Sequence, residues 1–256
     1  MKTDFIALLT DFSLSTPYVG LLKSVILSKN PAVSFIDLTH DIPPQNVRTA
    51  SFWVMSCLKY LPLNALLLSV IDPGVGGKRK IIWAKTNRHQ IISPDNGTIS
   101  WIEKEEKLRE IRCIENKNLF LDKISFTFHA RDIMAPAAAK IADGFPERKI
   151  GQKINKFVKF PFPRPDKKGR IIRGEIMCID NFGNAITNIA AKEVKSTSEV
   201  KIKKISLAIR KKYSDVKTGE ELALEGSFSF LELSIRNGSF ANKHKIKVGE
   251  RVEIIV

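Results

Sequence analysis

The sequence has little that would suit a secreted, membrane-spanning or metal-binding protein. Its 256 residues include only three cysteines, Cys57, Cys113 and Cys178, and no pair of them has CxxC or other metal-ligand spacing. We therefore expect free, buried thiols in a reducing compartment, and hence a cytoplasmic protein. No apolar run approaches the ~20 residues that a membrane span needs. The amino-terminal residues also lack the small-residue cleavage site of a secretory signal.

Acidic residues are scarce relative to basic ones. Lysines and arginines number 42 against 27 aspartates and glutamates, which gives a formal net charge of +15 and a pI near 9.7. The excess is concentrated in residues 145–217, where 19 basic residues face seven acids. A basic surface of this kind suits nucleic acid, but a solvated lysine-rich face has the same composition. Because no recognised nucleic-acid-binding motif accompanies it, nucleic-acid binding is only the alternative hypothesis.

The first part of the chain alternates strand-like and helix-like patterns. Apolar runs expected to form strands lie at 5–10, 33–38, 65–71, 80–85 and 90–93, and helical spacing is found from Pro17 onward, at 46–60 and at 134–142. Runs that are apolar on both faces predict an α/β domain with a largely parallel sheet flanked by helices. We assign this domain to residues 1–157.

The pattern of apolar, basic and turn-forming residues changes after that domain. Residues 158–170 (VKFPFPRPDKKGR) contain three prolines and a basic cluster, so we expect a linker without regular structure. Short β-like segments separated by turn residues come after it. Residues 171–256 are therefore predicted to form a smaller, mostly antiparallel β domain.

Two acids come directly after predicted strands of the first domain, Asp11 after FIALLT and Asp72 after LLLSVI. Ligands of open α/β sheets bind at these carboxyl ends, although aspartate also caps turns there. The glycines in SVIDPGVGGKRK (69–80) let the backbone turn tightly and approach a ligand. This loop can also return Arg79 to Asp72 and keep that acid ionised. It matches neither a Walker loop nor GxGxxG, so no phosphate cradle is indicated.

One histidine stands out by its neighbours. His129 lies in FTFHARD (126–132), between aromatic and charged residues, and is a candidate for catalysis, although a lone histidine is often structural. His89 and His244 are expected at the surface, and His40 is expected to orient a loop.

The second domain contains IDNFGNAITNI at 179–189. Asparagine and glycine at these positions are typical of a hairpin turn. An aromatic ring at Phe182 beside the amide of Asn184 would also make a purine site, with a stacking face and a two-way hydrogen-bonding edge.

Seven segments, taken in order, resemble the S-adenosylmethionine (SAM) hydroxide adenosyltransferase family, which is related to the fluorinases and chlorinases. The segments are LLTDFSLSTPYVG (8–20), DLTHDIPPQNV (37–47), SVIDPGVGGKRK (69–80), SPDNGTIS (93–100), FTFHARDIMAPAAA (126–139), IDNFGNAITNI (179–189) and GSFSFLELSIRNGS (226–239). Together they cover both predicted domains.

The resemblance implies an enzyme that hydrolyses SAM to adenosine and L-methionine. In the family an Asp, an Arg and a His act together on water, and the matching residues are Asp72, Arg79 and His129. The implied step is in-line attack of activated water on the ribose 5′ carbon. SAM is then the substrate, with no cofactor and no metal, and the first domain is catalytic.

The resemblance also implies substrate contacts and an assembly. The matching positions are Asp11 for the ribose hydroxyls, Phe128 beside the sugar, Asn184 with Phe182 for the adenine edge, Tyr213 for base stacking, Asp180 near the methionine ammonium, Ser227 with Phe228 at its carboxylate, and Asn237 in a loop that touches adenine. The family site lies between the first domain of one subunit and the second domain of its neighbour. A homotrimer is therefore implied.

The chain departs from the family pattern at a few positions. Ser13 stands where glycine is usual, Thr16 where an acid helps to hold the methionine ammonium, and Ala130 where a glycine is usual; Arg236 and Asn237 also differ. Two further alternatives remain in addition to the hypothesis that the protein only binds nucleic acid. One is a halide-using relative, and the other is an adenosine- or SAM-binding protein with weak or no catalysis whose basic region binds nucleic acid.

Overall fold

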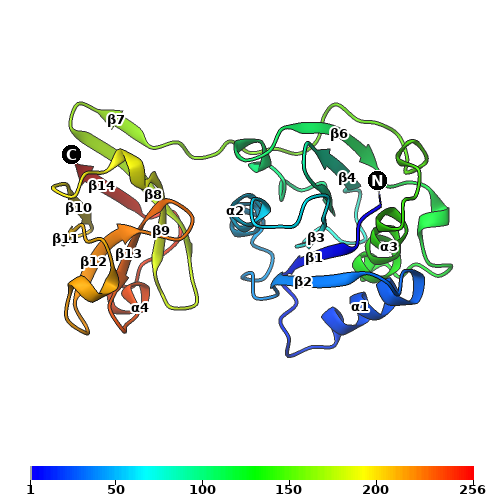
Figure 1. Cartoon of the computed structure of the whole chain (residues 1–256), viewed down its shortest axis with the longest axis horizontal. Helices are drawn as coiled ribbons and strands as arrows, with labels where there is room; N and C mark the ends of the chain where they lie inside the picture. Colours follow the sequence, from blue (N-terminus) through cyan, green and yellow to red (C-terminus); the bar gives the residue numbers. More distant parts are fainter. Residues whose placement is uncertain (1) are drawn as a thin grey trace. The chain divides into compact units, whose positions relative to one another are not determined.

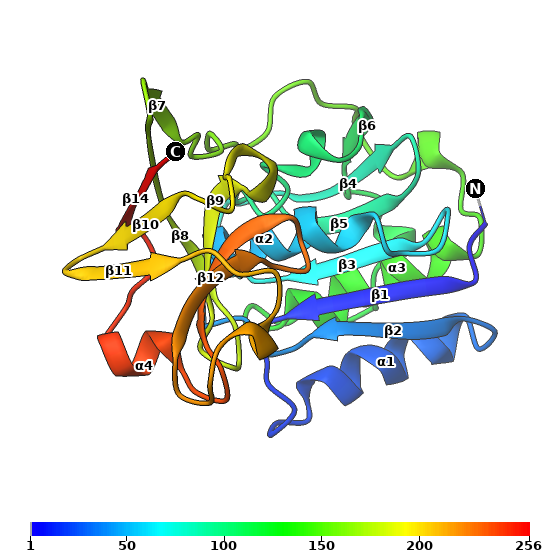
Figure 2. The same ribbon diagram turned by 60° about the vertical axis from the view of Figure 1, so that its left-hand side comes forward.

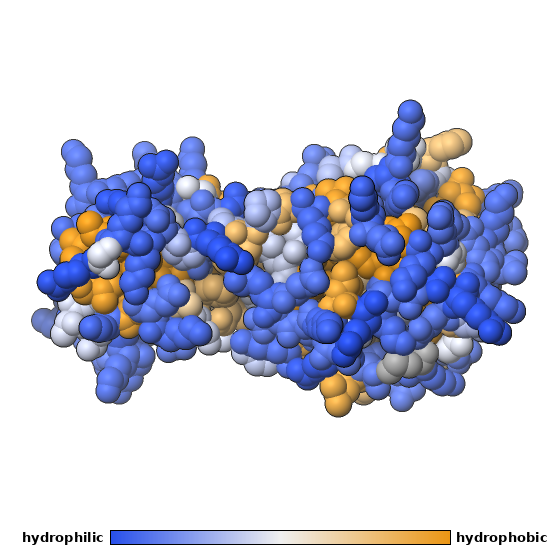
Figure 3. Space-filling view, turned by 90° about the horizontal axis from the view of Figure 1, so that it is seen from above, coloured by the Kyte–Doolittle hydropathy of each residue, from blue (hydrophilic) through white to orange (hydrophobic). Residues whose placement is uncertain are grey.

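The computed structural model describes residues 2–256, and the chain divides into two compact units, Met1–Pro161 and Phe162–Val256. Each unit is built around its own sheet (Figure 1). Within the described residues, no helix has the length and apolar character needed to cross a membrane. The face shown in Figure 3 is mainly hydrophilic and carries separate apolar patches.

The first unit contains a six-stranded mixed sheet in the order β2-β1-β3-β5-β4-β6. Its strands are β1 (Phe5–Thr10), β2 (Ser34–Thr39), β3 (Leu66–Val70), β4 (Ile81–Thr86), β5 (Gln90–Pro94) and β6 (Leu108–Cys113). Strands β2, β1, β3 and β5 are parallel, whereas β4 is antiparallel to both β5 and β6. The expected largely parallel sheet is confirmed.

Helices cover both faces of this sheet (Figure 2). The helices α1 (Tyr18–Lys29) and α3 (Ala135–Ala142) pack against each other and against one face of the sheet. The helix α2 (Val47–Leu58) packs against the other face. Asn46 caps α2, because its side chain accepts a hydrogen bond from the Thr49 N–H at 2.9 Å. The buried alanines of α3 lack bulk, which lets this helix approach α1 and the sheet closely.

The second unit contains an eight-stranded antiparallel sheet whose main path runs β11-β10-β14-β8-β9-β13-β12, with β7 paired to β8. These strands are β7 (Asp166–Lys168), β8 (Ile171–Ile179), β9 (Ala185–Ala190), β10 (Glu199–Ile202), β11 (Ile205–Ala208), β12 (Glu221–Glu225), β13 (Phe230–Ile235) and β14 (Arg251–Ile255), and the helix α4 spans Phe240–His244. A bridge between Ile209 and Ala223 joins the two ends of the path, so the sheet nearly closes into a barrel. The predicted antiparallel β character is confirmed.

The segment predicted to be an unstructured linker contains β7. Residues 166–168 pair with β8 through a tight turn in which Gly169 adopts a φ of 57°. Glycine at the first central position of a two-residue hairpin loop favours this pairing. The prediction was wrong here because its prolines end at position 165, before the strand begins.

His89 was predicted at the surface but is buried. Its Nδ1 lies 2.6 Å from Glu106 Oε1, and its Nε2 lies 3.0 Å from the Pro62 carbonyl oxygen. Both ring nitrogens are satisfied, so the turn between β4 and β5 can enclose the polar ring. Among the cysteines, Cys113 and Cys178 are buried, Cys57 is half-buried, and all three are free thiols.

Candidate active site

The carboxyl ends of β1 and β3 meet, because these strands are parallel neighbours and Thr10 is paired with Val70. Asp11 and Asp72 come after these strands within two residues, and both line one cavity of about 270 Å³. The remaining wall consists of Phe12, Gln45, Val70, Pro73, Val75, Thr127, Phe128, His129 and Ala130. The first unit therefore gathers Asp11, Asp72, Phe128 and His129 around one space.

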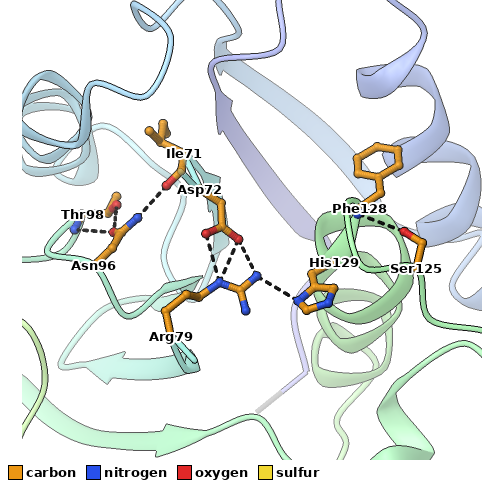
Figure 4. A network of polar contacts seen from close by, with 8 residues as sticks. All are labelled: Ile71, Asp72, Arg79, Asn96, Thr98, Ser125, Phe128 and His129. Carbon is orange, nitrogen blue, oxygen red and sulfur yellow. Dashed lines mark hydrogen bonds and ion pairs between the residues drawn. The ribbon is translucent and has the colours of Figure 1, made fainter. Parts of the chain in front are cut away.

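Arg79 joins Asp72 to His129 (Figure 4). Its Nε donates to both carboxylate oxygens of Asp72 at 3.0 Å, and its Nη2 donates to Oδ2 at 2.6 Å. The same Nη2 donates to Nδ1 of His129 at 3.0 Å. Only 7% of the Asp72 side chain and 12% of the Arg79 side chain are exposed, so water screens this pair poorly. The expected return of Arg79 to Asp72 is confirmed.

Glycines in the loop between β3 and β4 make this contact possible. A Cβ at Gly74 would lie 3.1 Å from Cγ of Arg79, so glycine leaves space for the arginine side chain. Gly76 has a φ of 76°, and a Cβ there would lie 2.3 Å from the carbonyl oxygen of Phe126. Gly76 therefore lets the loop approach the backbone of the segment that carries His129.

His129 immediately precedes a single π-helical turn, Ala130–Met134, which leads into α3. A guanidinium has donors only, so Nδ1 must accept from Arg79, and the imidazole is neutral with its proton on Nε2. Burial and the neighbouring Arg79 charge lower the pKa of His129 below its ordinary value, despite the opposing effect of Asp72. The site thus combines an ionised carboxylate with a neutral imidazole that can donate from Nε2.

The Asp11 loop is held by the segment after β2. Asp11 Oδ2 accepts a hydrogen bond from the Gln45 N–H at 2.8 Å. Thr10 Oγ1 lies 2.9 Å from Nδ1 of the buried His40, whose carbonyl oxygen accepts from the Ser13 N–H at 2.7 Å. His40 therefore orients a loop, as predicted. Gln45 was missed as a wall residue, since its contribution depends on a left-handed backbone, with φ 64°, that DIPPQNV does not reveal.

Three aromatic rings cluster beside this cavity. The rings of Phe12, Tyr18 and Phe128 meet edge to face, with centroids 5.2 to 5.9 Å apart. Phe128 is fixed further by its N–H, which donates to Ser125 Oγ at 3.0 Å. The cluster gives the cavity a firm apolar side next to its acids.

A second cavity, of about 510 Å³, lies in the second unit. Its wall contains Phe182, Asn184, Tyr213, Ile235, Asn237 and Gly238. Asp180 supports this wall, because its Oδ1 accepts from the backbone N–H groups of Phe182 and Asn184 and its Oδ2 accepts from Asn184 Nδ2 at 2.8 Å. The structure thus brings together five of the positions that the sequence assigned to this domain.

Ser227 and Phe228 are not part of that wall. They lie in the turn between β12 and β13, at the opposite end of β13 from Asn237. Glu232, in the middle of β13, was missed by the sequence reasoning. It is 6% exposed and accepts hydrogen bonds from the Tyr213 hydroxyl and from Ser234 Oγ. Burial and Glu232 together raise the pKa of Tyr213 to about 12, so the phenol stays protonated and its ring is anchored.

The structure shows the surroundings of three residues that depart from the family pattern. Ser13 has a φ of 57°, the left-handed region that favours glycine, and its hydroxyl lies 3.1 Å from that of Ser15. Thr16 turns its hydroxyl to the Phe12 carbonyl oxygen at 2.9 Å. Ala130 is buried and lines the first cavity.

Among residues 2–256, no group of three or more His, Cys, Asp or Glu side chains is arranged to hold a metal ion. The polar groups in the walls of the two cavities are carboxylates, amides, a hydroxyl, a phenol and an imidazole. They suit a polar organic ligand with hydroxyl and amine groups.

Comparison with known proteins agrees with this organisation. Residues 6–151 match the model of the SAM hydroxide adenosyltransferase N-terminal domain, and residues 174–253 match the model of its C-terminal domain. The chain is 33% identical to a Thermus thermophilus protein named (R)-S-adenosyl-L-methionine hydrolase, over 96% of this chain and 98% of that protein.

Two further comparisons concern a solved structure and a fluorinase. The structure of an uncharacterized conserved protein from Thermotoga maritima superposes with a TM-score of 0.93 at 35% identity, covering 98% of this chain and 100% of that one. A fluorinase of an Actinoplanes species is 24% identical over 72% of this chain and 71% of that protein. The chain belongs to the SAM hydroxide adenosyltransferase family.

Proposed function

We propose that this protein is an enzyme that hydrolyses SAM to adenosine and L-methionine. The observation that carries the proposal is the linkage of Asp72, Arg79 and His129, from two separate loops, beside one cavity. Membership of a family with hydrolase relatives supports the same reaction. The halide-using alternative has weaker support, because the fluorinase is more distant in sequence than the hydrolase.

The chemistry requires a positioned water. The sulfonium of SAM leaves as a neutral thioether, so the step needs no acid, metal or other cofactor to activate the leaving group. The bond from the water oxygen to C5′ forms while the C5′–S bond breaks, and the water loses one proton. Holding the nucleophile in line lowers the barrier by several kcal/mol, and a general base adds roughly a hundredfold or more.

Asp72 and His129 have complementary parts in this step. His129 Nε2–H donates a hydrogen bond to the water oxygen, and Asp72 accepts a hydrogen bond and then the proton. One lone pair of the oxygen then remains for attack on C5′. Arg79 does not belong to the described cavity wall, so its part is to hold Asp72 and His129 in register. Its bond to Nδ1 also fixes the tautomer that makes Nε2 a donor.

The substrate contacts are assigned to the two cavities. Asp11 binds the ribose hydroxyls, since a carboxylate accepts from two hydroxyls at once, and Phe128 lies beside the sugar. Phe182 and Tyr213 stack on adenine, and Asn184 and Asn237 read its edge. We also assign Asp180, which supports the second cavity, to the methionine ammonium, and Ser227 with Phe228, which lie outside both cavity walls, to its carboxylate.

We propose a homotrimer in which the first cavity of one copy meets the second cavity of its neighbour. Large apolar side chains support this assembly. Leu14 is 71% exposed and Phe126 83% exposed in loops next to the first cavity, and Phe182 is 76% exposed at the second. Packing against a neighbouring copy would remove these side chains from water.

The cellular setting is also a proposal. Three free thiols support a reducing compartment, and we propose the cytoplasm. The basic residues are proposed to form a solvated face, so neither nucleic acid nor a membrane is a required partner.

Incubation of the purified protein with SAM tests the function. We expect adenosine and L-methionine in equal amounts by chromatography, and their loss in Asp72→Ala and His129→Ala variants that remain folded. Product formation unchanged in both variants would overturn the assignment of the site. A product that depends on added chloride or fluoride would favour the halide-using alternative.

A further inference from the structure

The loop that carries Asp72 and Arg79 crosses a strand. It leaves β3 and returns to β4, but these strands are not neighbours, because β5 lies between them and pairs with both. The two ends of the loop therefore stand on either side of the carboxyl end of β5. The turn at that end is 94–97, PDNG, to which neither the reaction nor the substrate contacts assign a part.

The turn is bonded to both ends of the loop. Asn96 Nδ2 donates to the carbonyl oxygen of Ile71, the residue before Asp72, at 2.7 Å (Figure 4). The Asp95 N–H donates to the carbonyl oxygen of Lys80, the residue after Arg79, at 2.8 Å. The nine-residue stretch from Asp72 to Lys80 is thus tied at each end to one short turn.

The orientation of the Asn96 amide is fixed. Its Oδ1 accepts from the backbone N–H of Thr98 at 3.2 Å and from the Thr98 hydroxyl at 2.7 Å. Since these donors require an oxygen, the nitrogen must face Ile71. Thr98 is fully buried and Ile71 is buried as well, so water offers no replacement for the bond to the Ile71 carbonyl.

The turn is also supported from its other side. Asp95 Oδ1 accepts from the Val158 N–H at 2.8 Å. Gly97 has a φ of 102°, and a Cβ there would lie 2.4 Å from the Phe160 ring. The turn therefore rests on a separate segment of the first unit, and it can hold the loop instead of moving with it.

We propose that Asn96 is a positioning residue for the reaction: its amide fixes the Ile71 carbonyl, and with it the direction in which the loop presents Asp72 and Arg79 to His129. The inference rests on the proposed hydrolysis. Asn96 is outside the cavity wall and acts through the loop backbone. Misplacement of reacting groups by about 1 Å can cost roughly a hundredfold in rate, so a single buried hydrogen bond here has a large effect on turnover.

The test compares Asn96→Ala with Asn116→Ala. Asn116 makes two bonds of the same kinds, from Nδ2 to the Lys149 carbonyl oxygen at 2.7 Å and to Oδ1 from the Asn118 N–H at 3.0 Å, and neither partner belongs to the loop. At a temperature well below both unfolding midpoints, we expect kcat to fall about tenfold or more in Asn96→Ala with KM within about threefold. Asn116→Ala should retain both values within about twofold.

A second readout is independent of turnover. In the wild type, ¹⁵N NMR of His129 should show the Nε2–H tautomer, which depends on the hydrogen bond from Arg79. In Asn96→Ala this tautomer should give way to a mixture, while Asn116→Ala keeps the wild-type signal. If Asn96→Ala does not fold, Asn96→Asp keeps the acceptor for Thr98 and replaces the donor to Ile71 by a carboxylate oxygen, and the same changes in kcat and in the His129 signal are expected.

The outcomes separate the two claims. Wild-type kcat in Asn96→Ala, a change in KM alone, or an unchanged His129 signal would overturn the positioning role. A wild-type protein that releases no adenosine would overturn the proposed function, and the NMR comparison would still decide whether Asn96 sets the loop.

Discussion

Replacing Arg79 by lysine tests how much depends on the shape of the guanidinium. A lysine ammonium can keep the charge next to Asp72, but it cannot reach Asp72 and His129 with the fixed geometry of Nε and Nη2. The bond to His129 is then lost. A hydrogen bond to a charged group contributes about 1.5–3 kcal/mol, so kcat should fall roughly 10- to 150-fold. KM should change little, because Arg79 is outside the cavity wall.

The assay is steady-state release of adenosine from SAM, with Arg112→Lys as the matched control. Arg112 also pairs with an acid, Glu110, at 2.6 Å, and its Nη1 donates to the Gly151 carbonyl oxygen, but it lies on β6 and away from the triad. Arg112→Lys should keep its activity. A kcat for Arg79→Lys within twofold of wild type, or an equal loss in Arg112→Lys, would refute the reasoning.

The site gives two further predictions. The pKa of His129 is lowered, so the imidazole stays neutral to a lower pH than an ordinary histidine does. We expect kcat to fall only when the pH drops below the ordinary histidine pKa, because a proton on Nδ1 would then oppose Arg79. A pH–rate profile that falls already above the ordinary histidine pKa would contradict this. Co-expression of Asp72→Ala and Asn184→Ala subunits should restore roughly one quarter of the sites, because a ring of shared sites pairs each intact half at random. Mixed assemblies that are no more active than either variant alone would contradict a site shared between subunits.

The elements of the first unit were predictable because their apolar periodicity is strong. The strands that became β1, β3 and β5 are buried runs, and α2 begins at a capping asparagine. By contrast, β6 reads LREIRC, an edge strand in which three of the six residues are charged and two of these are adjacent, and no strand was predicted there. Charged side chains are common on edge strands, so the alternation of apolar and polar residues that predicts a strand is weak there.

Most residues of the candidate site could be named from the sequence, but apart from the return of Arg79 to Asp72 the contacts between them could not be predicted. Asp72, Arg79 and His129 could be named from motifs, but the sequence left open which of them receives the proton. That answer needs the Nη2–Nδ1 contact, which depends on a close approach of two backbones at Gly76. Glu232 was missed for a similar reason. Glu232 lies on β13 between Leu224 of β12 and Ile186 of β9, and the latter neighbour is distant in sequence.

The account can be tested most directly by running the reaction in ¹⁸O-labelled water and locating the label by mass spectrometry. Attack by an activated water at C5′ predicts one ¹⁸O atom in the 5′-hydroxyl of adenosine and none in L-methionine. Adenosine without the label, or no adenosine from a folded protein with the triad intact, would contradict it.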